Sequence, residues 1–346
     1  MTNINNLNIV EFKTLIKPNN LKLILGINEE IYKLVSKTRK EIEDILNRKS
    51  NKKIFIIGPC SIHNIEEAKD YGRKLFEIYQ KVKSKILIVM RVYFEKPRTT
   101  IGWKGLINDP DLNNTFNVNK GLRLARELLI YLNSIGLPCA CEFLDVITPQ
   151  YISDLISWGA IGARTTESQV HRQLSSGLSM PIGFKNGTKG SVELARDAII
   201  SASHQHCFMA ITDDGEPAIS TTKGNKNCHI ILRGGVSTNY SEENVKNTAS
   251  ILKDSQLIPN IMVDCSHGNS NKNYKNQEIV LYDIVNQIIN KEENIIGLML
   301  ESNINEGKQE LNSKNYNTLE YGVSITDSCI SIEETDKLVN YAFDKL

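Results

Sequence analysis

The chain has 346 residues, of which 40% are hydrophobic and 23% are charged, a composition typical of a globular protein and not of a disordered one. Its 41 basic and 40 acidic residues leave a formal net charge of +1, which argues against a general attraction to nucleic acid or anionic membrane. The sequence has no apolar run of about 18 residues, no signal-peptide pattern, and seven cysteines without a disulfide-framework spacing. We therefore expect a cytoplasmic protein without a membrane or nucleic-acid partner.

The first 50 residues are polar and differ from the rest of the chain. They predict an N-terminal arm followed by a helix, because apolar residues recur at helical spacing at Ile31, Leu34, Val35, Ile42 and Leu46. We expect the apolar face of this helix to pack on the rest of the protein.

From residue 53 onward, short apolar runs alternate with longer amphipathic stretches. The runs predict strands at 53–57, 86–91, 138–142, 160–163, 181–184, 207–211, 229–233, 260–264 and 296–300. The stretches between several of them predict helices, among them 65–83, 120–134, 149–158, 191–202 and 274–291. Almost continuously apolar strands separated by helices indicate an α/β protein whose parallel sheet is covered on both faces.

One of the nine predicted strands does not fit this alternation. The run at 207–211 is followed by the turn signal D-D-G and a second short run at 217–222, so residues 207–222 predict an inserted β-hairpin. The eight remaining strands are the number that a (β/α)8 TIM barrel requires. We therefore expect a barrel over residues 51–346 with an N-terminal extension and an inserted hairpin.

Nearly every predicted barrel strand is followed at once by a charged or reactive residue. These residues are Cys60 and His63, Arg91, Glu142, Arg164, Lys185, Arg233, Asp264 and His267, and Glu301. A charged residue often ends a strand simply because the strand meets solvent there. In an α/β barrel, however, all strands end at the face where the chemistry occurs. We therefore expect these side chains to converge on one mouth.

Cations dominate the expected mouth. Arg91, Arg164, Lys185 and Arg233 follow strands, and Lys96 and Arg98 lie on a proline-containing loop. So many cations would repel one another unless anions lie among them, and arginine matches phosphate and carboxylate groups with paired hydrogen bonds. The set predicts a ligand with several negative charges. The alternative is that each cation pairs with an acid of the core.

A second set combines Cys60, His267, Glu301 and Asp327. Thiolate, imidazole and carboxylate groups together suit a divalent transition metal such as Mn, Fe, Co or Zn. Because the four residues are far apart in the sequence, their spacing alone leaves the alternative that Cys60 is a packed core residue.

The same residues lie in motifs that resemble those of the type I, feedback-regulated 3-deoxy-D-arabino-heptulosonate 7-phosphate (DAHP) synthases of bacteria and yeast. The motifs include G-P-C-S-I-H at 58–63, M-R-V-Y-F-E-K-P-R-T-T-I-G-W-K-G-L at 90–106, G-F-K-N-G-T at 183–188, V-D-C-S-H-G-N-S at 263–270 and Y-G-V-S-I-T-D-S-C at 321–329. The resemblance extends from about residue 8 to residue 340. It implies a metal-dependent, aldol-type transferase that condenses phosphoenolpyruvate with D-erythrose 4-phosphate in the first step of the shikimate pathway.

By resemblance, one divalent metal ion is held by Cys60, His267, Glu301 and Asp327. The phosphoenolpyruvate site comprises Arg91, Arg164, Lys185 and Arg233, and the erythrose 4-phosphate site comprises Lys96, Arg98 and Thr99. Lys185, Cys60 and His267 are the implied catalytic residues, with Lys185 placed to donate a proton or to stabilise charge.

The resemblance also implies regulation by an aromatic amino acid, phenylalanine or tyrosine. In the regulated subtype, the N-terminal extension (residues 1–50) and the hairpin form the effector site and subunit contacts of a homodimer or homotetramer. The residues that correspond to the effector cavity are Val146, Gln150, Leu178, Ser179, Phe208 and Ala210. The segment 143–150 resembles the phenylalanine-sensitive form, whereas 176–181 and 263–272 resemble the tyrosine-sensitive form. Because the hairpin departs from both, feedback control could be altered or lost.

Three alternatives remain open from the sequence. The first is a 3-deoxy-manno-octulosonate 8-phosphate synthase, which shares the barrel and phosphoenolpyruvate chemistry. The second is an aldolase that forms a Schiff base through Lys185. The third is a catalytically silent barrel that senses aromatic amino acids.

Overall fold

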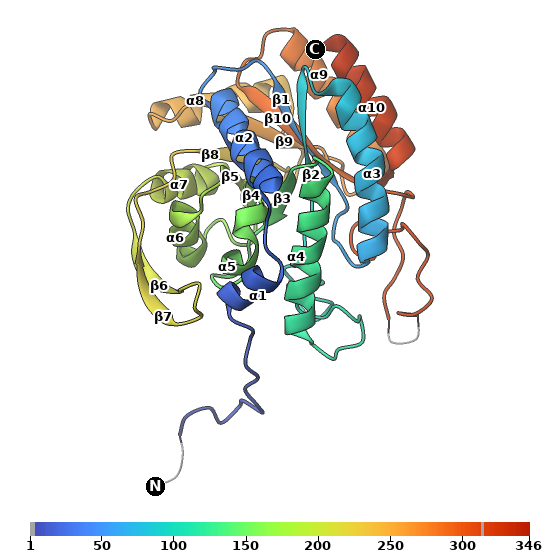
Figure 1. Cartoon of the computed structure of the whole chain (residues 1–346). Coiled ribbons are helices and arrows are strands. Elements are labelled where there is room, and N and C mark those ends of the chain that lie inside the picture. Colours follow the sequence, from blue (N-terminus) through green and yellow to red (C-terminus); the bar gives the residue numbers. More distant parts are fainter. Residues whose placement is uncertain (1–3, 313–314) are drawn as a thin grey trace.

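The computed structural model describes residues 4–312 and 315–346, and its centre is a closed barrel of parallel strands (Figure 1). Strand β10 pairs with β1 to close the ring. The predicted (β/α)8 TIM barrel is therefore confirmed. In order around the barrel, the strands are β1 (Lys53–Gly58), β2 (Ile86–Arg91), β3 (Cys139–Glu142), β4 (Trp158–Ile161), β5 (Ile182–Lys185), β8 (Cys228–Leu232), β9 (Ile261–Asp264) and β10 (Ile295–Asn303).

The strands are apolar along their length because both of their faces are buried. Alternate residues of β1 show this: Phe55 and Ile57 pack in the cluster shared with the outer helices, whereas Ile54 and Ile56 belong to a separate cluster inside the barrel. Burial on both faces explains why the sequence reads as short apolar runs without polar alternation.

Helix α2 (Glu29–Leu46) lies against the barrel as expected from its apolar face. The side chain of Asn28 accepts a hydrogen bond from Ile31 N at 2.9 Å and so begins the helix. At the other end, Ile42, Ile45 and Leu46 join the apolar cluster inside the barrel. The N-terminal extension is thus anchored to the barrel through α2.

The outer helices lie mostly where the sequence predicts them, with ends that differ by three residues or fewer. The predicted outer helices are α3 (Ile65–Val82), α4 (Val118–Ser134), α7 (Glu193–Ala202) and α9 (Gln277–Ile289). Outer helices that were not predicted are α6 (Gln169–Gly177), α8 (Glu242–Asp254) and α10 (Ile332–Lys345).

None of the helices of the described residues is both long and apolar enough to cross a membrane.

The helix predicted at 149–158 is wrong beyond Ile152. Helix α5 covers only Pro149–Ile152, a single 3₁₀ turn follows at Ser153–Leu155, and β4 already begins at Trp158. The indole of Trp158 is buried inside the barrel, where its Nε1 donates to Nε2 of His229 at 3.2 Å. The apolar spacing of this segment fits a helix equally well, and only the barrel interior makes Trp158 a strand residue.

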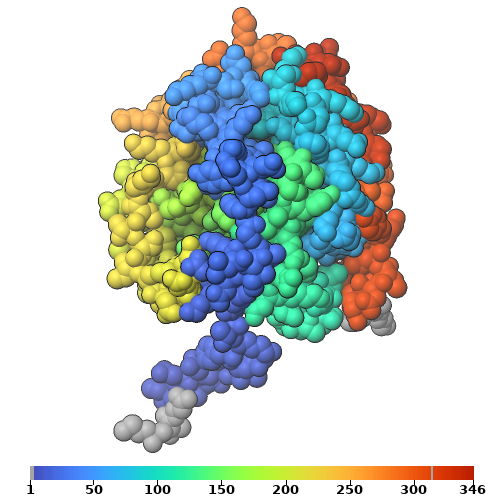
Figure 2. Space-filling model, in the orientation of Figure 1, coloured from blue at the N-terminus to red at the C-terminus, as the bar shows by residue number. Residues whose placement is uncertain are grey.

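The hairpin and the N-terminal arm lie at the same end of the molecule (Figure 1). Strands β6 (Cys207–Ile211) and β7 (Pro217–Thr221) form the predicted antiparallel hairpin, which is therefore confirmed. Helix α1 (Pro18–Ile24) contacts the turn of the hairpin through an ion pair between Lys22 Nζ and Asp213 Oδ1 at 2.8 Å, and Lys17, directly before the helix, pairs with Glu216 at 3.3 Å. Before α1 the arm projects from the body (Figure 2), and the side chain of Val10 is fully exposed.

Candidate active site at the carboxyl ends of the strands

A cavity of about 370 Å³ lies at the carboxyl ends of the barrel strands. Strand-end residues form part of its wall: Arg91 of β2, Glu142 of β3, Lys185 of β5 and Glu301 of β10. Loops after β4, β8 and β9 add Arg164, Arg233 and His267. The expected convergence is observed for these seven side chains, because parallel strands in a closed ring all end at one face. Cys60, His63 and Asp264 were expected there too, but they are buried and are not part of the cavity wall.

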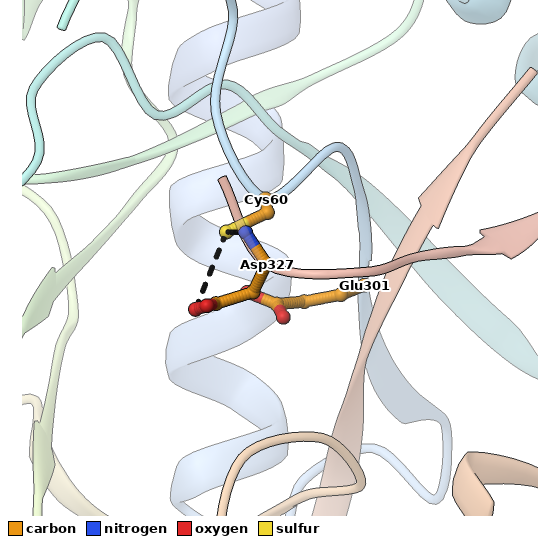
Figure 3. Close-up of side chains that lie close together, drawn as sticks. All are labelled: Cys60, Glu301 and Asp327. Atoms are coloured by element: carbon orange, nitrogen blue, oxygen red, sulfur yellow. Dashed lines mark hydrogen bonds between the residues drawn. The ribbon is translucent and has the colours of Figure 1, made fainter. Parts of the chain in front are cut away.

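Three of the four residues predicted to hold a metal lie together beside this cavity (Figure 3). One donor atom from each of Cys60, Glu301 and Asp327 lies within 4.8 Å of the other two. The Cys60 thiol lies 3.7 Å from Asp327 Oδ2 and accepts a hydrogen bond from Asp327 N at 3.4 Å. Burial, followed by the neighbouring Glu301 carboxylate, raises the pKa of the Cys60 thiol. A cation bound among these groups would stabilise the thiolate instead.

The group fits a divalent ion in both chemistry and spacing. Ligand atoms about 2.0 to 2.3 Å from one ion lie roughly 3 to 4 Å apart, so only a small adjustment is needed. Glu301 Oε1 is buried and accepts no well-aligned hydrogen bond from the described residues, although Arg91 Nη2 pairs with it at 2.9 Å. This oxygen is thus available as a ligand.

The fourth predicted ligand, His267, lies next to this group. Its Nε2 is 3.7 Å from Glu301 Oε1. Its Nδ1 is on the other side of the ring, 2.9 Å from Asp264 Oδ2. Nδ1 also lies 2.6 Å from Ser266 Oγ. The ring therefore presents Nε2 to the cavity side and Nδ1 to a buried carboxylate and a hydroxyl.

Arg91 is held rigidly beneath the cavity. Its guanidinium donates to the carbonyl oxygens of Pro59 (3.1 Å) and Cys60 (3.3 Å), and it stacks 3.7 Å from the ring centre of Tyr93. Burial by itself would lower the pKa of Arg91, but Tyr93 and Glu301 raise it. Nη1 has no hydrogen-bond partner among the described residues. A buried, fixed cation with a free donor is suited to an anionic ligand.

Two of the predicted cations do pair with acids of the core. Arg91 pairs with Glu301, and Lys185 Nζ donates to Asp264 Oδ2 at 2.7 Å. The alternative reading of the sequence is therefore correct for these two residues, but both still line the cavity. Arg164 and Arg233 also line it, and they form no ion pair within the described part of the chain.

The loop after β2 provides the remaining predicted cations. Lys96 Nζ donates to both the sulfur and the carbonyl oxygen of Cys60, each at 3.2 Å, whereas Arg98 donates to Trp103 O at 2.7 Å. Thr99 is exposed and is not part of the cavity wall.

The sequence reasoning missed two lysines on the wall, Lys272 and Lys308, because neither follows a predicted strand directly. Together, eight cationic and three acidic side chains line the cavity. The excess of positive charge favours a ligand that carries several negative charges.

Three buried asparagines that sequence reasoning also missed hold the loops of this face. Asn186 Oδ1 accepts from Arg233 N at 2.8 Å and from Asn239 Nδ2 at 3.1 Å. Asn239 N donates in turn to Asn269 Oδ1 at 2.8 Å. The network joins the ends of β5, β8 and β9 and so orients the residues that follow these strands.

Comparison with known proteins agrees with this geometry. The sequence model of the DAHP synthetase I family matches residues 10–340. The chain belongs to this family. It is 51% identical over 333 residues, 96% of this chain and 95% of the relative, to the Phe-sensitive phospho-2-dehydro-3-deoxyheptonate aldolase of Escherichia coli K12. The Tyr-sensitive enzyme of the same organism is 47% identical over 336 residues, 97% of this chain and 94% of the relative.

A solved structure is also similar to this chain over nearly its whole length. The phospho-2-dehydro-3-deoxyheptonate aldolase from Francisella tularensis SCHU S4 superposes with a TM-score of 0.95 at 51% identity, covering 98% of each chain. The likeness therefore includes the arm, the barrel and the hairpin.

Three of the six residues predicted to bind an effector, Gln150, Phe208 and Ala210, lie on or against the hairpin. Gln150 Nε2 donates to Ile211 O at 3.0 Å and joins the segment after β3 to the end of β6. Phe208 and Ala210 lie on β6 and are half-buried. Val146, after β3, and Leu178, directly after α6, are also half-buried. Ser179 is exposed.

Proposed function

We propose that this protein condenses phosphoenolpyruvate with D-erythrose 4-phosphate and water, giving 3-deoxy-D-arabino-heptulosonate 7-phosphate and inorganic phosphate in the first step of the shikimate pathway. The observation that carries the proposal is one cavity, in a member of the DAHP synthetase I family, that joins a Cys–Glu–Asp group to an excess of cations. Both substrates are phosphorylated and one also carries a carboxylate, so the charge of the cavity suits them.

Within this proposal, each predicted site residue has a role. Cys60, His267, Glu301 and Asp327 hold one divalent ion, which can be Mn, Fe, Co or Zn. Arg91, Arg164, Lys185 and Arg233 bind phosphoenolpyruvate, and Lys96, Arg98 and Thr99 bind erythrose 4-phosphate. A divalent ion in such a site supplies Lewis acidity toward a carbonyl oxygen.

The chain's own residues act mainly by positioning. Two phosphorylated anions repel each other, and the cations of the wall offset that repulsion while C3 of phosphoenolpyruvate is held against the aldehyde carbon. Lys185, which is ion-paired with Asp264, stabilises negative charge or donates a proton beside phosphoenolpyruvate.

The test follows phosphoenolpyruvate consumption by the purified protein with erythrose 4-phosphate. We expect consumption that a chelator abolishes and Mn²⁺ restores. Absence of consumption with metal present would contradict the proposal. Faster consumption with arabinose 5-phosphate would favour the octulosonate synthase, and an adduct trapped by borohydride would favour a Schiff-base aldolase.

We further propose that phenylalanine or tyrosine inhibits the enzyme at the hairpin, and that the protein is a homodimer or homotetramer. The exposed apolar side chains of the arm support the second part, because Val10 and Phe12 project from the body without a partner surface in one chain. Inhibition assays with Phe, Tyr and Trp in turn test the first part. Light scattering of the full chain tests the second.

A further inference from the structure

Asp264, the last residue of β9, lies between two groups that the proposed function uses separately. Its Oδ2 accepts a hydrogen bond from Lys185 Nζ at 2.7 Å and lies 2.9 Å from His267 Nδ1. The residue is only 1% exposed and is not part of the cavity wall. Asp264 can therefore act on a ligand only through its two neighbours.

The contact with His267 determines which ring nitrogen faces the cavity. Nδ1 also lies 2.6 Å from Ser266 Oγ, which donates its own proton to Asp264 Oδ1. Both oxygens beside Nδ1 therefore accept, so the proton of a neutral ring lies on Nδ1 and the lone pair lies on Nε2. Nε2 is the nitrogen that lies 3.7 Å from Glu301 Oε1. The carboxylate is itself fixed, since its Oδ1 accepts from Ser266 N at 3.0 Å and from Ser266 Oγ at 2.7 Å.

The contact with Lys185 stabilises a buried positive charge. Lys185 is 5% exposed, and burial disfavours an ammonium group that has no anionic partner. The ion pair therefore holds Nζ in place at the wall of the cavity.

We propose that Asp264 is a positioning residue that couples the metal site to the phosphoenolpyruvate site. One carboxylate fixes the His267 ring with Nε2 toward the cavity, where it would face a bound ion, and holds Lys185 Nζ on the side of the anionic substrate. Outer partners of this kind commonly change metal affinity when they are mutated. The inference rests on the proposed function for the identity of the two ligands.

The test compares three variants by equilibrium binding. Co²⁺ is titrated against a competing chelator, and phosphoenolpyruvate binding to the metal-free protein is measured by calorimetry. We expect His267→Ala to weaken only Co²⁺ binding and Lys185→Met to weaken only phosphoenolpyruvate binding. Asp264→Asn should weaken both, by roughly 10- to 100-fold for Co²⁺ and by about tenfold for phosphoenolpyruvate.

The outcomes separate this inference from the proposed function. Wild-type protein that binds neither Co²⁺ nor phosphoenolpyruvate would overturn the proposed function. Wild-type protein that binds both, with an Asp264→Asn variant that loses only one or that gains phosphoenolpyruvate affinity, would overturn the coupling alone.

Asp264→Asn leaves Lys185 buried without an anion and could unfold for that reason. The double variant Asp264→Asn/Lys185→Met removes both charges. It should lose Co²⁺ affinity to the same extent as the single Asp264→Asn variant, whereas Lys185→Met alone should keep it. Unchanged Co²⁺ affinity in the folded double variant would contradict the role of Asp264 toward His267. A matched control is Asp154→Asn, which breaks an ion pair with the buried Arg126 and should move neither affinity.

Discussion

Lys96 Nζ lies 3.2 Å from the sulfur of Cys60, so the loop after β2 touches the metal group directly. Under the proposed function this contact joins a residue for erythrose 4-phosphate to a residue for the ion. The ammonium opposes the effect of burial on the thiol, because a positive charge lowers the pKa of Cys60. A change at the residue proposed for erythrose 4-phosphate, Lys96, should therefore also affect the proposed metal ligand Cys60.

Replacement of Cys60 tests the metal group. Cys60→Ala should abolish metal binding and turnover while the far-UV circular dichroism spectrum stays unchanged, because the hydrogen bonds of the sulfur are made with Lys96 and Asp327, which line the cavity. Metal content is measured after dialysis, together with phosphoenolpyruvate consumption. Cys228→Ala is the control, since Cys228 is also buried but begins a strand at the other end of the barrel. Normal turnover in the Cys60 variant would refute the metal assignment.

Arg164 tests the phosphoenolpyruvate site with little risk to the fold, because it is exposed and forms no ion pair within the described residues. Arg164→Ala should raise the KM for phosphoenolpyruvate by roughly 10- to 100-fold, as expected for the loss of a charge-assisted hydrogen bond. Steady-state kinetics measure it. Arg123→Ala, on the outer face of α4, should leave KM unchanged. An unchanged KM in the Arg164 variant counts against the assignment.

Substitution of Asn186 tests whether the buried asparagine network holds the loops at the carboxyl ends of the strands. Asn186→Ala should lower the free energy of unfolding by about 3 kcal/mol, since partners are left unsatisfied, and should also raise the KM for phosphoenolpyruvate by releasing Arg233. Urea denaturation and kinetics measure the two effects. Asn133→Ala removes a buried amide that donates to Leu129 O and Leu155 O away from the cavity. It should destabilise the protein without a change in KM, and equal KM values in the two variants would contradict the role of Asn186.

The pH dependence of stability is tested at Glu67, which is 5% exposed and lies 3.4 Å from His63 Nε2. Burial raises the pKa of Glu67 to about 7, although Gly322 N and Asn64 oppose the shift. The folded state therefore holds this proton where the unfolded chain, with an ordinary carboxyl pKa of about 4.3, has lost it. The contribution to stability is present below the unfolded pKa and is lost as the pH rises toward and past 7.

Glu67→Gln isolates this contribution. Between pH 5 and pH 8 the wild-type protein should lose roughly 2 to 3 kcal/mol of unfolding free energy relative to the variant. Urea denaturation at the two pH values measures the difference. Parallel pH profiles for the two proteins would show that Glu67 titrates normally.

Substitutions at the hairpin test whether the inhibiting amino acid binds there. Phe208→Ala and Gln150→Ala should raise the concentration of phenylalanine or tyrosine needed for half-inhibition by at least about tenfold, because each removes a contact of the proposed cavity. The uninhibited kcat should stay the same, since neither residue lines the catalytic cavity. Met209→Ala is the control, because Met209 is exposed next to Phe208 in β6. Unchanged inhibition in both test variants would place the effector elsewhere.

Much of the fold follows from the sequence because the barrel strands are buried on both faces and read as short apolar runs. Segments whose conformation is set by tertiary contacts cannot be predicted from the sequence in the same way. The end of α5 and the start of β4 were misplaced, since Trp158 has a strand conformation only because its indole fits the barrel interior beside His229. Lys272 and Lys308 were missed because they lie in loops, and no periodic sequence pattern predicts which loop residues line the cavity.

The sequence by itself determined the barrel and the set of side chains at its mouth, because the ends of parallel strands in a closed ring meet at one face. The tertiary structure alone decided how those side chains are paired. It brings Cys60 next to Asp327, 267 positions away along the chain, and it places Asp264 between Lys185 and His267. Such contacts depend on strand register and loop conformation, which set distances between atoms on different strands and leave no periodic trace in the sequence.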